Sequence, residues 1–166
     1  MYRKIIFPSI KTSLKLSNLD NKTAIVTGGA TGLGKKMAEH FASNNVNTII
    51  CSRNLERLEK TTYEINKQYG DKVKFFQVDV ADLNTVNQFY ENLKEQNIKP
   101  DILVNNAAGN FISRTEDLSP NAINKVIDIV LKGTVNMTIP FSKNIFEEEK
   151  IGSIINISTL YADTGS

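Results

Sequence analysis

The chain has 166 residues, with 20 basic and 18 acidic side chains, one histidine, one cysteine and no tryptophan. This length predicts a single domain, and 40% apolar with 23% charged residues is ordinary for a globular protein. A net charge of +2 is too small to indicate nucleic-acid binding, which needs clustered positive charge. A single cysteine excludes an intrachain disulfide and a multi-thiolate metal site, so we expect a reducing compartment and no metal. No apolar run approaches the roughly 20 residues that span a bilayer, which excludes stable membrane insertion.

The first segment, residues 1–20, differs in composition from the rest of the chain. It carries four basic residues among serines and threonines before its first acidic residue, Asp20. Basic, hydroxylated and acid-poor segments are typical of organellar transit peptides. A disordered basic tail or a short first strand is the alternative, and the composition leaves both open. We therefore divide the chain into a basic leader over 1–20 and a folded domain over 21–166.

From residue 21 onward, short β-branched runs alternate with longer amphipathic stretches. Strands are predicted at residues 23–26, 48–51, 73–78, 102–104 and 153–157, and helices over 32–44, through 55–65, after an N-cap at Asp82 and from about Pro120. Pro140 falls within the last helix and is expected to kink or divide it. Alternating strands and helices predict right-handed crossovers and a parallel sheet, and continuously apolar strands indicate that helices cover both faces. The expected fold is a Rossmann-type, doubly wound α/β domain with three α/β/α layers.

The first strand runs directly into a glycine-rich turn, TGGATGLG, at residues 27–34. In such a turn Gly28 permits a sharp bend, Gly32 lets the backbone approach a pyrophosphate, and Gly34 allows the helix to pack closely on the sheet. The N-terminus of the following helix offers free N–H groups and a positive dipole end to phosphates. A tight strand–helix connection is the alternative. The position of the turn, after a strand and before a helix, favours dinucleotide binding.

The end of the second strand distinguishes between the two nicotinamide dinucleotides. A carboxylate at this place binds the adenosine ribose 2′-hydroxyl of NAD, but the chain has CSRN at residues 51–54. Arg53 can pair with a 2′-phosphate through charge-assisted hydrogen bonds, and the Ser52 hydroxyl can assist. An exposed arginine that merely follows a strand is the alternative. The absence of an acid favours NADPH over NADH.

Two further segments follow strands and should border the same cofactor. Asp79 and Val80 come after the third strand, and NNAAG at residues 105–109 comes after the fourth. Ligands of doubly wound sheets bind beyond the carboxyl ends of the strands, and small residues at 107–109 leave room for a flat group against the backbone. The predicted cofactor-binding residues are therefore Gly28, Thr31, Gly32, Leu33, Gly34, Ser52, Arg53, Asp79, Val80, Asn106, Ala107 and Gly109.

The turn at 27–34 together with NNAxG at 105–109 resembles the short-chain dehydrogenase/reductase family. The longer runs NNAAGNFIS at 105–113 and STLYADTGS at 158–166 are similar to its 2,4-dienoyl-CoA reductase branch, especially the mitochondrial form. The resemblance covers the chain from about residue 21 to its end. It implies an NADPH-dependent oxidoreductase that acts on a 2,4-dienoyl-CoA in the β-oxidation of unsaturated fatty acids, and a homo-oligomer, a tetramer, for the intact enzyme. Mitochondria are the favoured location, while a peroxisomal or cytoplasmic one stays open.

The same resemblance implies two catalytic residues, Asn110 and Tyr161. In the dienoyl-CoA reductase branch, the Asn that ends the NNAAGN run and a Tyr after the fifth strand hydrogen-bond the thioester carbonyl of the substrate. Hydride addition at the far end of the diene spreads negative charge to the thioester oxygen, so donors aimed at this oxygen stabilise the dienolate. A partly buried tyrosine at a strand end is the alternative for Tyr161.

Two departures from the family pattern affect these expectations. Lys132 stands where the family carries an Asn that supports a water chain to its active-site Lys. That active-site Lys, and the last two of the family's seven strands, would lie beyond residue 166, so five strands are expected here. Two alternatives to a dienoyl-CoA reductase stay open: a truncated, non-catalytic module that binds nucleotide or pairs with other subunits, and another NADP-linked reductase of the same family.

Overall fold

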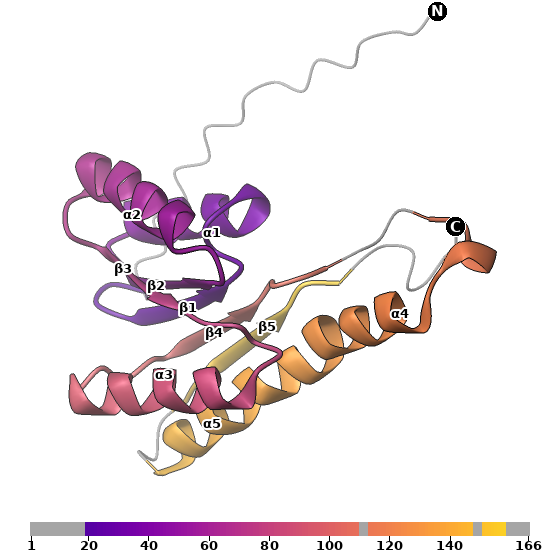
Figure 1. The fold of residues 1–166 in the computed structure, drawn as a ribbon. Coiled ribbons are helices and arrows are strands. Elements are labelled where there is room, and N and C mark those ends of the chain that lie inside the picture. Colours follow the sequence, from indigo (N-terminus) through magenta and orange to yellow (C-terminus); the bar gives the residue numbers. More distant parts are fainter. Residues whose placement is uncertain (1–18, 110–112, 148–150, 159–166) are drawn as a thin grey trace, which may run out of the picture.

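The computed structural model describes residues 19–109, 113–147 and 151–158, which form one parallel sheet with helices on both of its faces (Figure 1). The five strands lie in the order β3-β2-β1-β4-β5, and every neighbouring pair is parallel. The strands are β1 (Thr23–Thr27), β2 (Asn47–Ser52), β3 (Val73–Gln77), β4 (Ile102–Asn105) and β5 (Ser153–Asn156). The predicted strands are therefore all present within a residue or two of their expected positions.

The helices lie in two layers. Figure 1 shows α1 and α2 on one face of the sheet and α3 and α5 on the other. The helical elements are α1 (Gly32–Ser43), α2 (Leu55–Tyr69), α3 (Leu83–Glu95), η1 (Thr115–Asp117), α4 (Pro120–Ile127), η2 (Asp128–Lys132) and α5 (Gly133–Glu147). This arrangement confirms the predicted doubly wound α/β fold with three layers.

The strand order reverses beside β1, the central strand. Val26 of β1 pairs with Ile50 of β2 on one side and with Val104 of β4 on the other. The chain thus proceeds outward through β2 and β3, then returns to the opposite side of β1 for β4. The chain leaves β1 for α1 on one face of the sheet and leaves β4 for helices on the other face, and doubly wound sheets bind ligands beyond the carboxyl ends of the strands at such a reversal.

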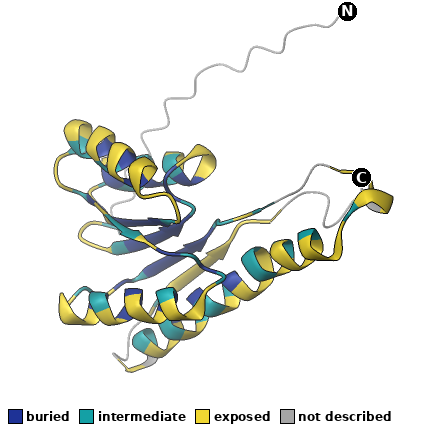
Figure 2. Ribbon diagram, in the orientation of Figure 1, coloured by how far each residue is buried: buried dark blue, intermediate teal, exposed yellow. Residues whose placement is uncertain are grey.

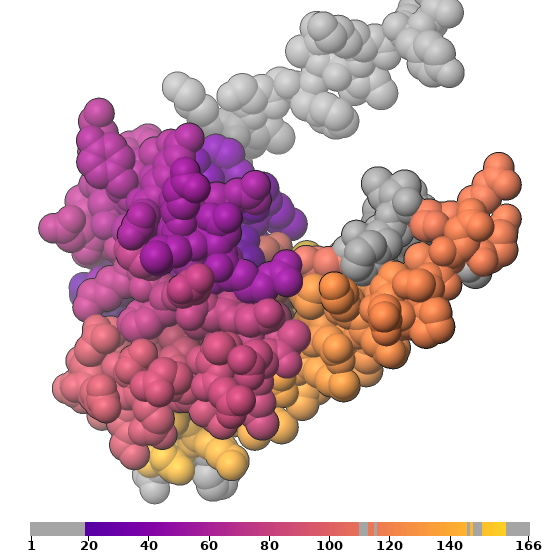
Figure 3. All heavy atoms as spheres, viewed as in Figure 1, coloured from indigo at the N-terminus to yellow at the C-terminus, as the bar shows by residue number. Residues whose placement is uncertain are grey.

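Burial is concentrated on the central strands. Packing of their buried side chains fixes the position of the strand ends. Ile25, Phe89, Leu103 and Phe141 belong to an apolar cluster between the sheet and the α3–α5 layer, and each is at most 2% exposed. Figure 2 shows the buried colour on β1, β2 and β4, whereas β5 is exposed along its described length. In Figure 3, the part of the chain that includes α4 extends away from the rest of the molecule. No residue of α4 is buried.

The last helical stretch departs from our prediction. It begins at Pro120 as expected, but α5 continues through Pro140 and is not divided there. Met137 and Phe141 are fully buried on either side of Pro140, so packing on the sheet holds the helix together although proline lacks one N–H donor. The irregularity lies earlier, in η2, a π-helical turn. No helix in the described part of the chain is long and apolar enough to cross a membrane.

Candidate cofactor-binding site

The glycine turn between β1 and α1 owes its shape to two backbone conformations and one close contact. Gly28 and Gly32 have φ angles of 65° and 54°, in the left-handed region that favours glycine. A methyl group at Gly32 would meet no atom within 4 Å, so the space beside this residue is open. A methyl group at Gly34 would overlap the Gly28 carbonyl oxygen, so only glycine lets α1 start this close to the turn.

The N-terminus of α1 differs from those of α2, α3 and α4. The side chains of Asn54, Asp82 and Ser119 cap α2, α3 and α4 by accepting a backbone N–H. At the N-cap of α1, Thr31 makes no such bond, and the first turn of this helix contains no acidic residue. The N–H groups and the positive dipole end of α1 are thus left for an anion.

The turn is tied to β4 by a small hydrogen-bond network around a buried hydroxyl. Thr27 Oγ1 accepts from the backbone N–H groups of Asn106 and Ala107, at 2.9 Å each, and donates to the Val104 carbonyl at 3.3 Å. The Asn106 carboxamide donates in turn to the Thr27 carbonyl at 2.9 Å. Asn106 therefore holds the glycine turn in place, and its carboxamide is already hydrogen-bonded to the backbone of that turn.

A pocket of about 120 Å³ lies at the carboxyl ends of the strands, beside this turn. It brings together six of the predicted residues from four separate segments: Gly28, Ser52, Arg53, Asp79, Val80 and Ala107. Its other lining residues are Cys51, Val78, Ala108 and Ile129. Ile129 comes from η2, and no sequence signal indicated it, because the side of a helix that faces a pocket depends on the turn geometry.

The rim of this pocket at β2 carries the guanidinium of Arg53. Arg53 is exposed, and its backbone carbonyl accepts a 2.9 Å hydrogen bond from the Gln77 carboxamide. The Ser52 hydroxyl donates weakly, at 3.5 Å, to the Asn54 carbonyl. Among the residues that the structure describes, no carboxylate lies within ion-pair distance of Arg53. This rim can bind a dianion.

Another part of the lining is the loop after β3, which internal hydrogen bonds hold in place. The Asp79 carboxylate accepts the Ala81 N–H at 3.0 Å, and the Thr85 hydroxyl donates to the Asp79 carbonyl at 2.8 Å. The Asn136 carboxamide of α5 donates to the Val80 carbonyl at 2.9 Å. The two predicted residues of this loop are thus fixed before any ligand arrives.

The remaining predicted residues lie around the pocket or outside the described part of the chain. Thr31, Gly32 and Leu33 are exposed at the start of α1, and Gly109 lies against Ile129. Asn110 and Tyr161, the residues expected to contact the substrate, lie outside the described residues.

The single histidine lies on the surface, and the single cysteine is buried. His40 is exposed on α1, and Cys51 is 1% exposed at the end of β2. Burial raises the pKa of the Cys51 thiol, which keeps it protonated and unreactive near neutral pH. No group of three or more His, Cys, Asp or Glu side chains in the described ranges is arranged to hold a metal ion.

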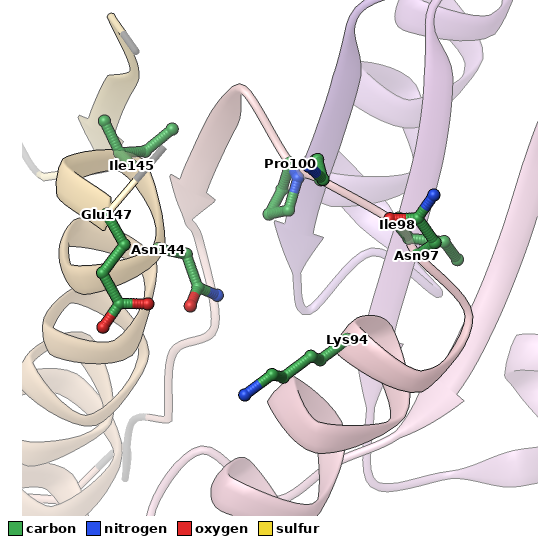
Figure 4. A pocket seen from close by; sticks show the side chains of 8 residues that line it. Lys94, Asn97, Ile98, Pro100, Asn144, Ile145 and Glu147 are labelled. Atoms are coloured by element: carbon green, nitrogen blue, oxygen red, sulfur yellow. The ribbon is translucent and has the colours of Figure 1, made fainter. Parts of the chain in front are cut away.

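A second hollow, of about 240 Å³, lies at the other end of the sheet (Figure 4). It lies between the ends of α3 and α5, and its lining includes Lys94, Asn97, Asn144 and Glu147. These residues surround the amino ends of the strands, away from the glycine turn. Ligands of doubly wound sheets bind at the carboxyl ends, so the smaller pocket is the candidate cofactor site.

The glycine turn, the uncapped helix and the pocket at the strand reversal define a nucleotide-binding α/β domain. Residues 22–166 match the family model of the short chain dehydrogenases, and the chain belongs to this family.

Two relatives come from Caenorhabditis elegans. An uncharacterized oxidoreductase is 44% identical over 96% of this chain and 52% of its own length. A probable 2,4-dienoyl-CoA reductase that produces (3E)-enoyl-CoA is 44% identical over 89% of this chain and 48% of its own length. A solved short chain dehydrogenase from Bacillus anthracis is 39% identical, with a TM-score of 0.82 over 87% of this chain and 60% of that one. The chain thus spans about half the length of these curated relatives.

Proposed function

We propose that this protein is an NADPH-dependent 2,4-dienoyl-CoA reductase that acts in the β-oxidation of unsaturated fatty acids. The observation that carries this proposal is the 44% identity to a probable 2,4-dienoyl-CoA reductase, which extends over 89% of the chain. The NNAAGNFIS run at residues 105–113 supports the same substrate, since it includes Asn110 of the proposed carbonyl-binding pair. The family is shown by the matching family model, so the oxidoreductase activity, the dienoyl-CoA substrate and the cofactor are the proposed parts.

NADPH is supported by the charge and shape of the pocket. Arg53 stands at the end of β2, where NAD-binding sheets place a carboxylate, and it has no carboxylate neighbour among the described residues. The open space beside Gly32 and the uncapped N-terminus of α1 fit a pyrophosphate, because backbone N–H groups there lack partners from side chains. The chain's residues thus fit both the 2′-phosphate and the pyrophosphate of NADPH.

NADPH, when bound, supplies a hydride to C5 of the conjugated diene. In the proposed chemistry, Asn110 and Tyr161 donate hydrogen bonds to the thioester oxygen, on which the negative charge of the dienolate accumulates. A proton added at C2 then completes the two-electron reduction to a 3-enoyl-CoA. Hydrogen bonds between Thr27 and Asn106 hold the glycine turn against the loop after β4, so the backbone that would bind the pyrophosphate is supported from within the chain.

The proposal is tested by following NADPH oxidation at 340 nm with 2,4-hexadienoyl-CoA as substrate. We expect turnover by the full-length protein. Arg53→Ala should weaken NADPH binding about 10- to 100-fold, which is the value of a charge-assisted hydrogen bond to phosphate. NADH lacks this phosphate, so its binding should change less than about twofold. Lys67→Ala, which removes an exposed cation from the far end of α2, is the control and should change neither. Absence of turnover with dienoyl-CoA substrates of several chain lengths would reject the substrate. Turnover with simple carbonyl compounds instead would favour another NADP-linked reductase.

A mitochondrial location, a leader over residues 1–20 and a tetrameric whole protein are further proposals. Peroxisomal 2,4-dienoyl-CoA reductases are also among the relatives, so the location needs a direct test. Fusion of residues 1–20 to a fluorescent protein should direct it to mitochondria, and a diffuse signal would reject the leader. Light scattering of the purified whole protein should give four times the protomer mass.

A further inference from the structure

The hollow at the amino ends of the strands is not explained by cofactor binding. Its volume, about 240 Å³, is twice the 120 Å³ of the cofactor pocket, and it lies at the other end of the sheet. It is lined by the last turn of α3, the loop at residues 97–100 and the last turn of α5 (Figure 4). A ligand bound here would leave the glycine turn accessible.

The loop at residues 97–100 is shaped by the end of α3. The Ile98 N–H donates to the Leu93 carbonyl at 2.8 Å, and the Asn97 N–H donates to the Lys94 carbonyl at 3.0 Å. These two bonds, with Asn97 at a φ of 52°, are the Schellman ending of a helix. Ile98 also packs on the apolar cluster that contains Leu93. The loop is therefore fixed by the chain itself, before any ligand is present.

The apolar part of the lining is also held in place. Pro100 is buried, and Ile98 and Ile145 pack against the apolar cluster between the sheet and the α3–α5 layer. A methyl group at Gly152 would come within 2.8 Å of Ile145 Cγ1, so the backbone before β5 supports this isoleucine. Ile98, Pro100 and Ile145 thus form a preformed apolar surface that an aliphatic chain can cover.

Charges of opposite sign come from the two helices that border the hollow. Figure 4 shows Lys94 extending from α3 toward α5, which carries Asn144 and Glu147. Among the residues that the structure describes, Lys94 and Glu147 have no ion-pair partner and do not pair with each other. The carboxamides of Asn97 and Asn144 likewise have no hydrogen-bond partner in the described ranges. The hollow therefore offers a cation, a carboxylate and two carboxamides to a ligand.

This mixture of charges selects among ligands. A simple anion attracted by Lys94 would be repelled by Glu147, and a simple cation would be attracted and repelled in the reverse sense. Lys99 also lines the hollow, but it already has an interaction partner. Because Lys94 and Glu147 belong to different helices and do not pair, a ligand that meets both must carry its charges apart, with an apolar chain between them.

We propose that this hollow binds an aliphatic zwitterion, whose carboxylate pairs with Lys94 and whose ammonium pairs with Glu147. The chain between the two charges lies on the apolar surface, and the carboxamides of Asn97 and Asn144 hydrogen-bond the charged ends. A free ω-amino acid and the C-terminal lysine of a peptide share this chemistry. The inference goes beyond the proposed function and does not require a bound dinucleotide.

The test is a titration of the isotope-labelled full chain with 6-aminohexanoate, followed by two-dimensional NMR. Amide signals at residues 94–100 and 144–147 should shift, whereas those of the glycine turn at 27–34 should not. Norleucine is an isomer of this probe with both charges at one end, and hexanoate and hexylamine carry one charge each. All three should bind about threefold more weakly, because one of two exposed ion pairs is lost.

Two variants assign the charges to residues. Lys94→Gln should weaken 6-aminohexanoate about threefold without weakening hexylamine, and Glu147→Gln should weaken it equally without weakening hexanoate. The controls, Glu95→Gln and Lys143→Gln, alter exposed neighbours that do not line the hollow and should leave all affinities unchanged. All four side chains are exposed, so each variant should fold, which circular dichroism verifies.

A peptide that ends in lysine distinguishes the two sources of the ligand. Tighter binding of this peptide than of 6-aminohexanoate assigns the site to a protein C-terminus, and equal or weaker binding assigns it to a free ω-amino acid. The proposal is overturned if 6-aminohexanoate binds no more tightly than its three analogues or shifts the glycine turn instead. It is also overturned if Lys94→Gln and Glu147→Gln behave like their controls. These measurements do not involve dienoyl-CoA turnover, so their failure is distinct from failure of the proposed function.

Discussion

The buried hydroxyl of Thr27 offers a sharp test of how the glycine turn is held. Thr27→Val replaces the hydroxyl with a methyl group of nearly the same size, so packing is retained while hydrogen bonding is lost. Thr27 Oγ1 accepts two backbone N–H groups, from Asn106 and Ala107, in a position that is 1% exposed. Each buried donor left without a partner costs about 1–3 kcal/mol, so the variant should lose about 2–6 kcal/mol of unfolding free energy.

A matched control exists in the same chain. The Thr62 hydroxyl of α2 is also buried but has no hydrogen-bond partner among the described residues. Thr62→Val should therefore be neutral or slightly stabilising, because it removes a polar group that is buried without compensation. Thr27→Ser keeps the hydroxyl and should lose only about 1 kcal/mol, the value of one buried methyl group.

Urea unfolding followed by circular dichroism measures all three variants, since the chain has no tryptophan for fluorescence. A loss below about 0.5 kcal/mol in Thr27→Val would refute the reasoning, because that network would then contribute nothing. Equal losses of unfolding free energy in Thr27→Val and Thr62→Val would also refute the reasoning. They would show that burial of the hydroxyl, and not its hydrogen bonds, determines the loss of stability.

Two other predictions concern residues near the pocket. Cys51 should resist iodoacetamide at pH 8 in the native chain and react after unfolding. The reason is that burial raises the pKa of its thiol, and the thiolate is the reactive form. Equal labelling of native and unfolded chains in mass spectrometry would contradict this prediction. Lys132→Ala should change the unfolding free energy by less than about 0.5 kcal/mol, since its ion pair with Asp128 is exposed and exposed ion pairs contribute little. A loss well above that in urea unfolding would mean that the ion pair, and not packing on Gly109 and Val80, holds the π-turn.

The features that sequence predicted well are those decided by neighbouring residues. The strands follow from continuous β-branched runs, and Pro120 marks the start of α4 because proline suits a first helical turn. The positive φ angles of Gly28 and Gly32 follow from a glycine pattern that few other residues tolerate. Arg53 could be placed at a pocket rim because parallel strands bring their carboxyl ends to one edge.

The features that sequence missed depend on residues far apart in the chain. The π-turn at η2 is decided by contacts of Ile129 with Gly109 and of Gly133 with Val80, which no local pattern reveals. Pro140 was expected to kink or divide the helix, and it does not divide it, because burial of Phe141 on the sheet outweighs the single hydrogen bond that proline removes. The bracing role of Asn106 likewise requires β1 and β4 to lie side by side.

The adjacency of β1 and β4 also has a consequence for the order of folding. Thr23 and Asn47 pair across a separation of 24 residues, whereas the bond between Thr23 and Asp101 spans 78. The units that join β1, β2 and β3 are thus local and can assemble first, while β4 must close a much longer loop, and contacts at long sequence separation form slowly. Until β4 pairs with β1, the Thr27 hydroxyl lacks its two backbone donors, the N–H groups of Asn106 and Ala107. The glycine turn also lacks the hydrogen bond from the Asn106 carboxamide. A ligand that binds across this junction therefore stabilises only the chain in which β4 has docked, and it links occupancy of the pocket to completion of the sheet.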